Sequence, residues 1–155
     1  MSAKMLSHIF NYNYRSLKMN TDDISHEESL ISPDQGGNCI NWVVGHILSS
    51  RIGILQKLGE SNIPNANKYL QYSRGSETVI DSSNAILIKQ LLKDLQESQE
   101  KLENALSNLS EVDLEKPIEK KTLGETLEFL QFHETYHIGQ LGILRRIVGK
   151  EGAIK

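Results

Sequence analysis

Hydrophobic residues recur about every three to four positions along most of the chain, which is the period of an amphipathic helix. No segment alternates apolar and polar residues as a half-buried strand would. The first predicted helix spans about residues 2–20, and the second starts with Asn38 as its N-cap and ends near Gly59. The pattern therefore indicates an all-α protein.

Two further helices are predicted in the second half of the chain. Ser82 or Ser83 opens the third helix, whose leucines and isoleucines keep a nearly heptad spacing that is interrupted at Ser98. Thr122 and Glu125 form a capping box at the start of the fourth helix, which ends at Gly149. The heptad spacing is typical of helices that pack in a bundle.

The segments between these helices are polar and rich in turn residues. Residues 21–37 and 60–81 are long enough to be crossover connections rather than tight turns. Residues 1–155 are therefore expected to form one domain, a four-helix bundle with long crossover connections.

His133 and His137 lie one turn apart in the fourth helix, on the same stripe as its leucines. Burying an imidazole without a partner costs about 1–3 kcal/mol, so each ring needs a partner. Residues four apart are neighbours on a helix surface, and their ring nitrogens can therefore bind one ion. The pair indicates a metal site; the alternative is two core histidines bonded to hydroxyl or carbonyl groups.

A metal site of this kind needs at least one more protein ligand. His46 lies on the second helix at the margin of its apolar face, beside small residues. His8 shares the first helix with polar residues and His26 lies in an acidic loop, so both are expected to face solvent. His46 is therefore the predicted third ligand; the alternative is a ring bonded to a neighbouring backbone carbonyl.

The composition excludes several other classes of function. The 17 basic and 20 acidic residues give a net charge of −3, so the chain lacks the excess of positive charge that is typical of proteins that bind nucleic acid. No run approaches the roughly 18 apolar residues of a membrane span, and residues 1–14 lack the apolar core of a signal peptide. The lone Cys39 excludes an internal disulfide and fits a reducing compartment, so a soluble cytoplasmic protein is expected.

The stretch His133-Glu134-Thr135-Tyr136-His137 also matches the motif of zinc proteases, in which the glutamate is a general base. Such proteases usually take a third ligand from a downstream element, where Glu151 is the only carboxylate of this chain. The sequence also offers no edge strand that could hold a peptide. Proteolysis is therefore disfavoured.

Two stretches together resemble the DinB-like (YfiT-like) superfamily of metal-binding four-helix bundles. They are Asn41-Trp42-Val43-Val44-Gly45-His46 and His133-Glu134-Thr135-Tyr136-His137-Ile138-Gly139-Gln140, followed by Leu144-Arg145-Arg146 and Gly149-Lys150. The resemblance covers essentially the whole chain in helix order. It implies a divalent metal held by His46, His133 and His137, activity as a transferase or isomerase that uses bacillithiol or mycothiol, and pairing as a homodimer.

A site of three histidines leaves at least one coordination position open. A thiol at that position would be deprotonated and could attack an electrophilic small molecule, so a metal-dependent thiol S-transferase is the expected activity. The same position can instead activate water, as in a hydrolase. A third possibility is a non-catalytic, stress-related bundle that binds metal for structure or sensing. Zinc and nickel are the expected ions, although three imidazoles also suit copper or iron.

Two more residues of the fourth helix are candidates for a role beside the metal. Gln140 lies one turn after His137, where its amide can orient a ring or reach a ligand; helix packing is the alternative. Glu134 falls in the core sector and can accept a ring N–H, enter the metal shell or pair with a basic residue from another helix. A supporting role for Glu134 is favoured over general-base catalysis, and no catalytic residue is assigned.

Overall fold

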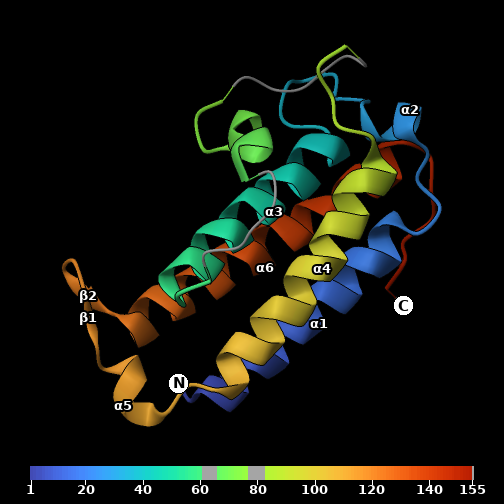
Figure 1. Cartoon of the computed structure of the whole chain (residues 1–155). Coiled ribbons are helices and arrows are strands. Elements are labelled where there is room, and N and C mark those ends of the chain that lie inside the picture. Colours follow the sequence, from blue (N-terminus) through green and yellow to red (C-terminus); the bar gives the residue numbers. More distant parts are fainter. Residues whose placement is uncertain (61–65, 77–82, 155) are drawn as a thin grey trace.

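A computed structural model describes residues 1–60, 66–76 and 83–154 and contains four long helices (Figure 1). These are α1 (Ala3–Thr21), α3 (Ile40–Lys57), α4 (Ile88–Ser107) and α6 (Leu123–Ile147). The elements between them are α2 (His26–Ser29), the 3-10 helix η1 (Ala66–Tyr72), α5 (Glu111–Leu114) and strands β1 (Pro117–Ile118) and β2 (Lys121–Thr122). The predicted all-α bundle is confirmed, and a two-stranded antiparallel hairpin is added to it.

The long helices form a ring in which α1 and α3 each pack against both α4 and α6. Helices α1 and α6 run in one direction, and α3 and α4 run in the other (Figure 1). Because α3 and α4 are parallel, the chain has to return along the bundle between them. This requirement explains the long connection that the sequence predicts over residues 60–81.

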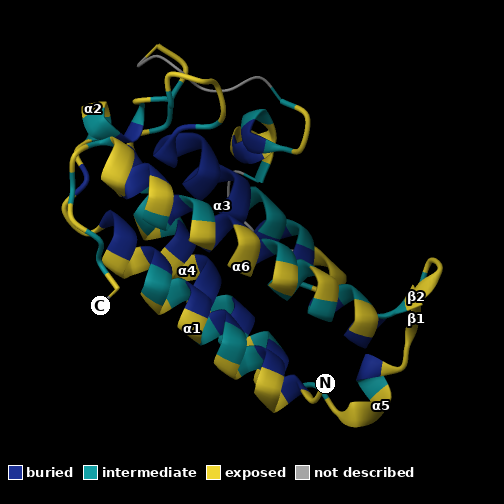
Figure 2. Cartoon of the chain, turned by 180° about the vertical axis from the view of Figure 1, so that it is seen from behind, coloured by how far each residue is buried: buried dark blue, intermediate teal, exposed yellow. Residues whose placement is uncertain are grey.

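The core lies between the four long helices, and α3 is its most continuously buried element (Figure 2). Every residue from Ile40 to Leu48 is buried, because this helix faces α4, α6 and η1. In α4, the predicted heptad positions Leu91, Leu95 and Leu102 are buried, and so is Ser98 between them. In the described part of the chain, no helix combines the length and the apolar character that crossing a membrane requires.

The predicted ends of α6 are confirmed by its capping groups. Thr122 accepts a hydrogen bond from the backbone N–H of Glu125, and the Glu125 carboxylate accepts one from the backbone N–H of Thr122. Gly149 follows the helix with a φ of +83°, a conformation that favours glycine. The capping box therefore fixes where the helix with the histidine pair begins.

The predicted starts of the second and third helices are wrong. Cys39, not Asn38, is the N-cap of α3. Ser83 lies in a turn and α4 begins only at Ile88, while Ser82 lies outside the described residues. Just before α4, the backbone groups of Ile86 are bonded to the side chains of Tyr72 and Asn41.

Short helices occupy parts of both predicted crossover loops. Helix α2 lies within residues 21–37, and η1 lies within the described part of residues 60–81. The 3-10 helix η1, drawn in green in Figure 1, lies beside α3 and packs against it. The described part of the second crossover therefore packs against the helix that carries His46.

Candidate metal centre

The side chains of His46, His133 and His137 meet between α3 and α6. The Nε2 atoms of His46 and His133 are 3.4 Å apart, and those of His137 and His133 are 3.1 Å apart. One ring nitrogen from each of the three residues lies within 4.8 Å of the others. Within the described residues, this is the one group of three His, Cys, Asp or Glu side chains close enough to hold an ion.

The separations of the ring nitrogens fit a transition-metal ion. Two nitrogens bound about 2.0–2.1 Å from a tetrahedral centre lie roughly 3.3 Å from each other. The separations of 3.4 Å and 3.1 Å fall on either side of that value. The three residues that the sequence singles out can therefore hold one metal ion between them.

Hydrogen bonds on the outer side of two rings determine which nitrogen faces the centre. Nδ1 of His46 lies 2.7 Å from the backbone carbonyl oxygen of Tyr72, and Nδ1 of His137 lies 2.8 Å from Oε1 of Gln140. These oxygens only accept, so both Nδ1 atoms carry the hydrogen and both Nε2 atoms present lone pairs. His133 can donate one Nε2–H at most, so a cation satisfies the three nitrogens better than hydrogen bonds do.

The alternative explanation for His46, a ring bonded to a backbone carbonyl, accounts for only one of its two ring nitrogens. A backbone carbonyl does bind its ring, yet it engages only Nδ1 and leaves Nε2 facing the other two histidines. A ligand ring held from behind by an oxygen acceptor is the usual arrangement around protein-bound metals.

Burial lowers the pKa of all three histidines. For His137 the pKa falls to about 4, mainly because the buried ring is desolvated and further because His46 and His133 lie nearby, while the bond to Gln140 opposes the shift. The rings are therefore neutral at pH 7, which is the form that binds metals.

The lowered pKa of His137 predicts that the metal-free protein loses stability in mild acid. In the unfolded chain this ring takes up a proton below its ordinary pKa of 6.5, whereas the folded protein resists protonation down to about pH 4. The unfolded state then binds more protons, so the free energy of unfolding falls as the pH decreases between these two values. Denaturant unfolding with a chelator present checks this, and His137→Gln should show a shallower pH dependence; an equal slope would contradict the assignment.

Tyr72, whose carbonyl holds His46, is itself fixed on α3. Its ring packs against Gly45, where a Cβ atom would overlap the ring. Its hydroxyl donates to Oδ1 of Asn41 at 2.9 Å and accepts from the backbone N–H of Ile86 at 3.0 Å. The Asn41 amide also donates to the Ile86 carbonyl at 2.8 Å, so both backbone groups of Ile86 are bonded to residues outside α4. Asn41 and Gly45 thus anchor the segment that orients His46.

Three aromatic rings surround the histidines. Trp42 stacks on His46 with 4.7 Å between ring centroids and 11° between planes, and its Nε1 donates to Oγ of Ser76. Phe129 stacks on His133 at 6.3 Å and Tyr136 meets His137 edge-on at 5.3 Å. Trp42 therefore covers one face of the His46 ring, and Phe129 and Tyr136 lie beside the other two rings.

Replacing Gln140 by leucine is expected to weaken metal binding by about 10–100-fold, because losing the partner behind a ligand ring has effects of this size. Leucine keeps the apolar volume of the side chain but cannot accept from Nδ1 of His137. Competition with a chromophoric chelator measures the dissociation constant. Gln56→Leu, at an exposed position of α3, is the control; equal affinities of the two variants would mean that Gln140 only packs.

Glu134 points away from the histidines into the centre of the bundle. Its Oε2 accepts from Nε of Arg51 at 2.8 Å, and its Oε1 accepts from Nη2 of Arg51 at 2.9 Å. Glu134 therefore pairs with a basic residue from another helix, and it does not accept a ring N–H from a ligand histidine or join the group of possible metal ligands. With both oxygens engaged, Glu134 is not placed to act as the general base of a zinc protease.

The Arg51 guanidinium joins Glu134 to the other helices. Its side chain is fully buried, and its Nη1 donates to Oε1 of Gln99 at 2.6 Å. Glu103 accepts from Nε2 of Gln99 at 2.7 Å and from Nδ2 of Asn11 at 2.8 Å. The network therefore connects α1, α3, α4 and α6 directly behind the metal centre. Arg51 is not among the site residues predicted from the sequence, although a lone cation on the apolar face of α3 is a visible signal.

The other histidines and the cysteine lie outside the centre. His8 is exposed on α1 as expected, whereas His26 is half-buried at the start of α2. Cys39 is buried, and burial raises the pKa of its thiol, which disfavours the reactive thiolate.

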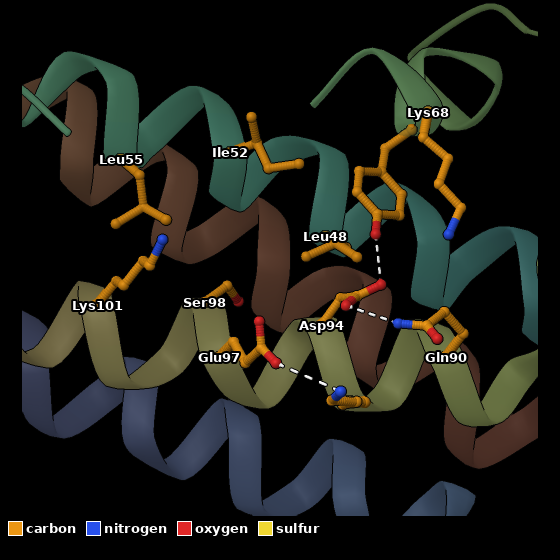
Figure 3. A pocket seen from close by; sticks show the side chains of 11 residues that line it. Leu48, Ile52, Leu55, Lys68, Gln90, Asp94, Glu97, Ser98 and Lys101 are labelled. Carbon is orange, nitrogen blue, oxygen red and sulfur yellow. Dashed lines mark hydrogen bonds and ion pairs between the residues drawn. The ribbon is translucent and has the colours of Figure 1, made fainter. Parts of the chain in front are cut away.

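A cavity of about 190 Å³ lies between α3, α4 and η1, and none of the three histidines lines it (Figure 3). Its floor is apolar and includes Leu48 and Ile52, and its rim is charged. Asp94 accepts from the Tyr69 hydroxyl and from Nε2 of Gln90, so both of its oxygens are engaged within the protein (Figure 3). This cavity is distinct from the metal centre, and the Asp94 carboxylate within it is already bonded to the protein.

Comparison with known proteins supports the same assignment. The family model of the DinB superfamily matches residues 9–141, which include all three histidines, two of the four long helices in full and most of the other two. Comparison with curated proteins gives no match, and comparison with solved structures gives none. The match extends over most of the 155 residues, and the chain therefore belongs to the DinB superfamily, whose members bind metals.

Proposed function

We propose that the protein is a metal-dependent enzyme that activates a low-molecular-weight thiol for transfer to an electrophilic substrate. The observation that carries the proposal is the convergence of three Nε2 atoms without a fourth His, Cys, Asp or Glu ligand among the described residues. Structural zinc sites are normally closed by four protein ligands, whereas catalytic sites keep three and leave a position for substrate.

A divalent ion such as zinc or nickel would act as a Lewis acid and lower the pKa of a thiol that enters the open position. The chain itself orients the imidazoles through Tyr72 and Gln140 and shields their sides with Trp42 and Phe129. In the reaction the thiol sulfur bonds to the electrophilic carbon, the leaving group departs with the former bonding pair, and the thiol proton passes to solvent. Holding sulfur and carbon together in the right orientation is the main contribution of the protein.

A transferase is favoured over a hydrolase by the position of Glu134. Hydrolysis is commonly assisted by a general base beside the attacking water. The carboxylate next to the ligands in sequence, Glu134, is instead bonded through both oxygens to Arg51. A thiol is far more acidic than water and needs no such base once its pKa is lowered further.

The test uses tag-free protein loaded with zinc or nickel, three thiols (bacillithiol, mycothiol and cysteine) and monochlorobimane as a fluorogenic electrophile. Metal-dependent formation of the thioether is expected with at least one thiol, together with its loss in His46→Ala. His8→Ala, which changes an exposed histidine outside the group of three, should retain the activity. A metal-loaded protein that turns over none of these thiols would support a non-catalytic metal-binding bundle instead.

A further inference from the structure

The cavity between α3, α4 and η1 lies beside Ser98, where the leucine spacing of α4 is interrupted. The buried residues Leu91, Leu95 and Leu102 keep a nearly heptad spacing, and Ser98 lies one heptad after Leu91, between Leu95 and Leu102. A leucine at this position would extend into the cavity that Ser98 lines. The shorter serine leaves that space open.

The side chain of Ser98 is satisfied within its own helix. Its Oγ donates to the backbone carbonyl oxygen of Leu95 at 2.6 Å, and only 6% of the residue is exposed. The opposite wall is formed by three buried apolar residues of α3, namely Leu48, Ile52 and Leu55. Buried water needs several polar partners, whereas apolar cavities stay dry and accept apolar molecules. This wall therefore favours an apolar occupant.

The size of the cavity limits what can enter it. Protein interiors are normally packed with few gaps larger than a water molecule, and an apolar cavity of roughly 150 Å³ accepts a benzene ring. The cavity here has a volume of about 190 Å³. The space therefore fits an apolar body of about six to eight carbons.

The rim of the cavity carries three cations and two carboxylates. The cations are Lys68 from η1 and Lys93 and Lys101 from α4, and the carboxylates are Asp94 and Glu97. Asp94 accepts two hydrogen bonds from within the protein, and Glu97 pairs with Lys93 at 3.9 Å (Figure 3). Lys68 and Lys101 lie at opposite ends of the cavity, and the Lys101 side chain extends from α4 towards α3 (Figure 3). Because both carboxylates are engaged and the cations outnumber them, the rim favours an anion.

We infer that this cavity is a binding site for a small amphipathic anion, with an apolar body of about six to eight carbons. The apolar body lies against the α3 wall and beside Ser98, and the anionic group lies at the rim near Lys68 or Lys101. None of the three histidines lines the cavity, so the site is separate from the metal centre and does not depend on the proposed activity. An uncharged molecule would use the wall without the lysines, and a cation would be repelled by them.

Isothermal titration calorimetry of the full chain with straight-chain carboxylates tests the site. Octanoate is expected to bind with a dissociation constant of about 1 mM or lower. Affinity should rise up to about fourfold for each methylene from butanoate to octanoate, since each buried methylene contributes to this extent. Octan-1-ol and octylammonium, which have the same chain without the negative charge, should bind more weakly. A wild type that does not bind octanoate, or that prefers octylammonium, would overturn the inference.

Two substitutions of Ser98 test whether the ligand occupies this cavity. Ser98→Leu should raise the octanoate dissociation constant by at least about 10-fold, because the larger side chain takes the space of about three methylenes. Its melting temperature should be equal to or higher than that of the wild type, since filling a cavity stabilises a fold. Ser98→Ala is the matched control: it removes only the hydroxyl and should bind octanoate like the wild type. Both variants keep the metal centre intact, so equal affinities in the two would place octanoate elsewhere and overturn the inference.

Neutralising the rim tests the preference for an anion without changing the core. The double variant Lys68→Gln with Lys101→Gln should bind octanoate at least about threefold more weakly, as expected for partly exposed charges, and should bind octan-1-ol as the wild type does. Lys89→Gln changes an exposed lysine of α4 that does not line the cavity, and it should leave both affinities unchanged. A double variant that keeps the full preference for octanoate over octan-1-ol would overturn the assignment to an anion.

Discussion

Replacing His137 by alanine is expected to abolish stoichiometric metal binding and to leave most of the bundle folded. The variant removes one of three converging nitrogens, and the two that remain give a far weaker site. The fold should survive because helix packing, not the ion, dominates stability in a domain with an apolar core of this extent. Plasma mass spectrometry of tag-free protein measures the metal, and circular dichroism measures the helices.

His46→Ala should lose the metal in the same way, while His8→Ala should retain about one equivalent. The first two variants remove ligands from opposite sides of the centre, on α3 and on α6, so a shared loss would establish that both helices contribute. Full metal occupancy in His137→Ala would refute the three-histidine site. Loss of metal and of helical structure together would assign the ion a structural role.

The bundle could be predicted from the sequence because its signals are local. The leucine spacing in α4 and the Thr122–Glu125 capping box in α6 depend only on nearby residues, and both are present as predicted. The start of α4 could not be predicted in this way. Serine is a good N-cap in general, but here Ile86 is bonded to Tyr72 and Asn41, which come from distant parts of the chain.

The metal centre was only partly visible in the sequence. The three histidines could be recognised in the sequence by their residue type and helical spacing, and the structure brings them together. The role of Tyr72 could not be predicted from the sequence, because the group that holds His46 is its backbone carbonyl, which every residue has. The signal for a close approach was Gly45, which leaves room for the Tyr72 ring. Arg51 could have been paired with Glu134, since each is a lone charge on an apolar helix face.

Replacing Arg51 by methionine is expected to lower the free energy of unfolding by about 3–5 kcal/mol, the usual cost of leaving one member of a buried ion pair alone. Glu134 is 2% exposed and would lose both of its hydrogen bonds, and Gln99 would lose its donor as well. Domains of this size are stable by about 5–15 kcal/mol, so the loss is a large share of the total. Denaturant unfolding followed by circular dichroism measures it.

The double variant Arg51→Met with Glu134→Met distinguishes lost charge from lost packing. Exchanging a whole buried ion pair for apolar side chains is often neutral or stabilising, so the double variant should recover most of the stability that Arg51→Met loses. Lys93→Met breaks an ion pair whose members are 70% and 56% exposed, and it should cost less than about 1 kcal/mol. A double variant as unstable as the single one would assign the effect to packing.

Metal affinity should change by less than about 10-fold in the double variant, because the bonds that orient the imidazoles come from Tyr72 and Gln140 and remain intact.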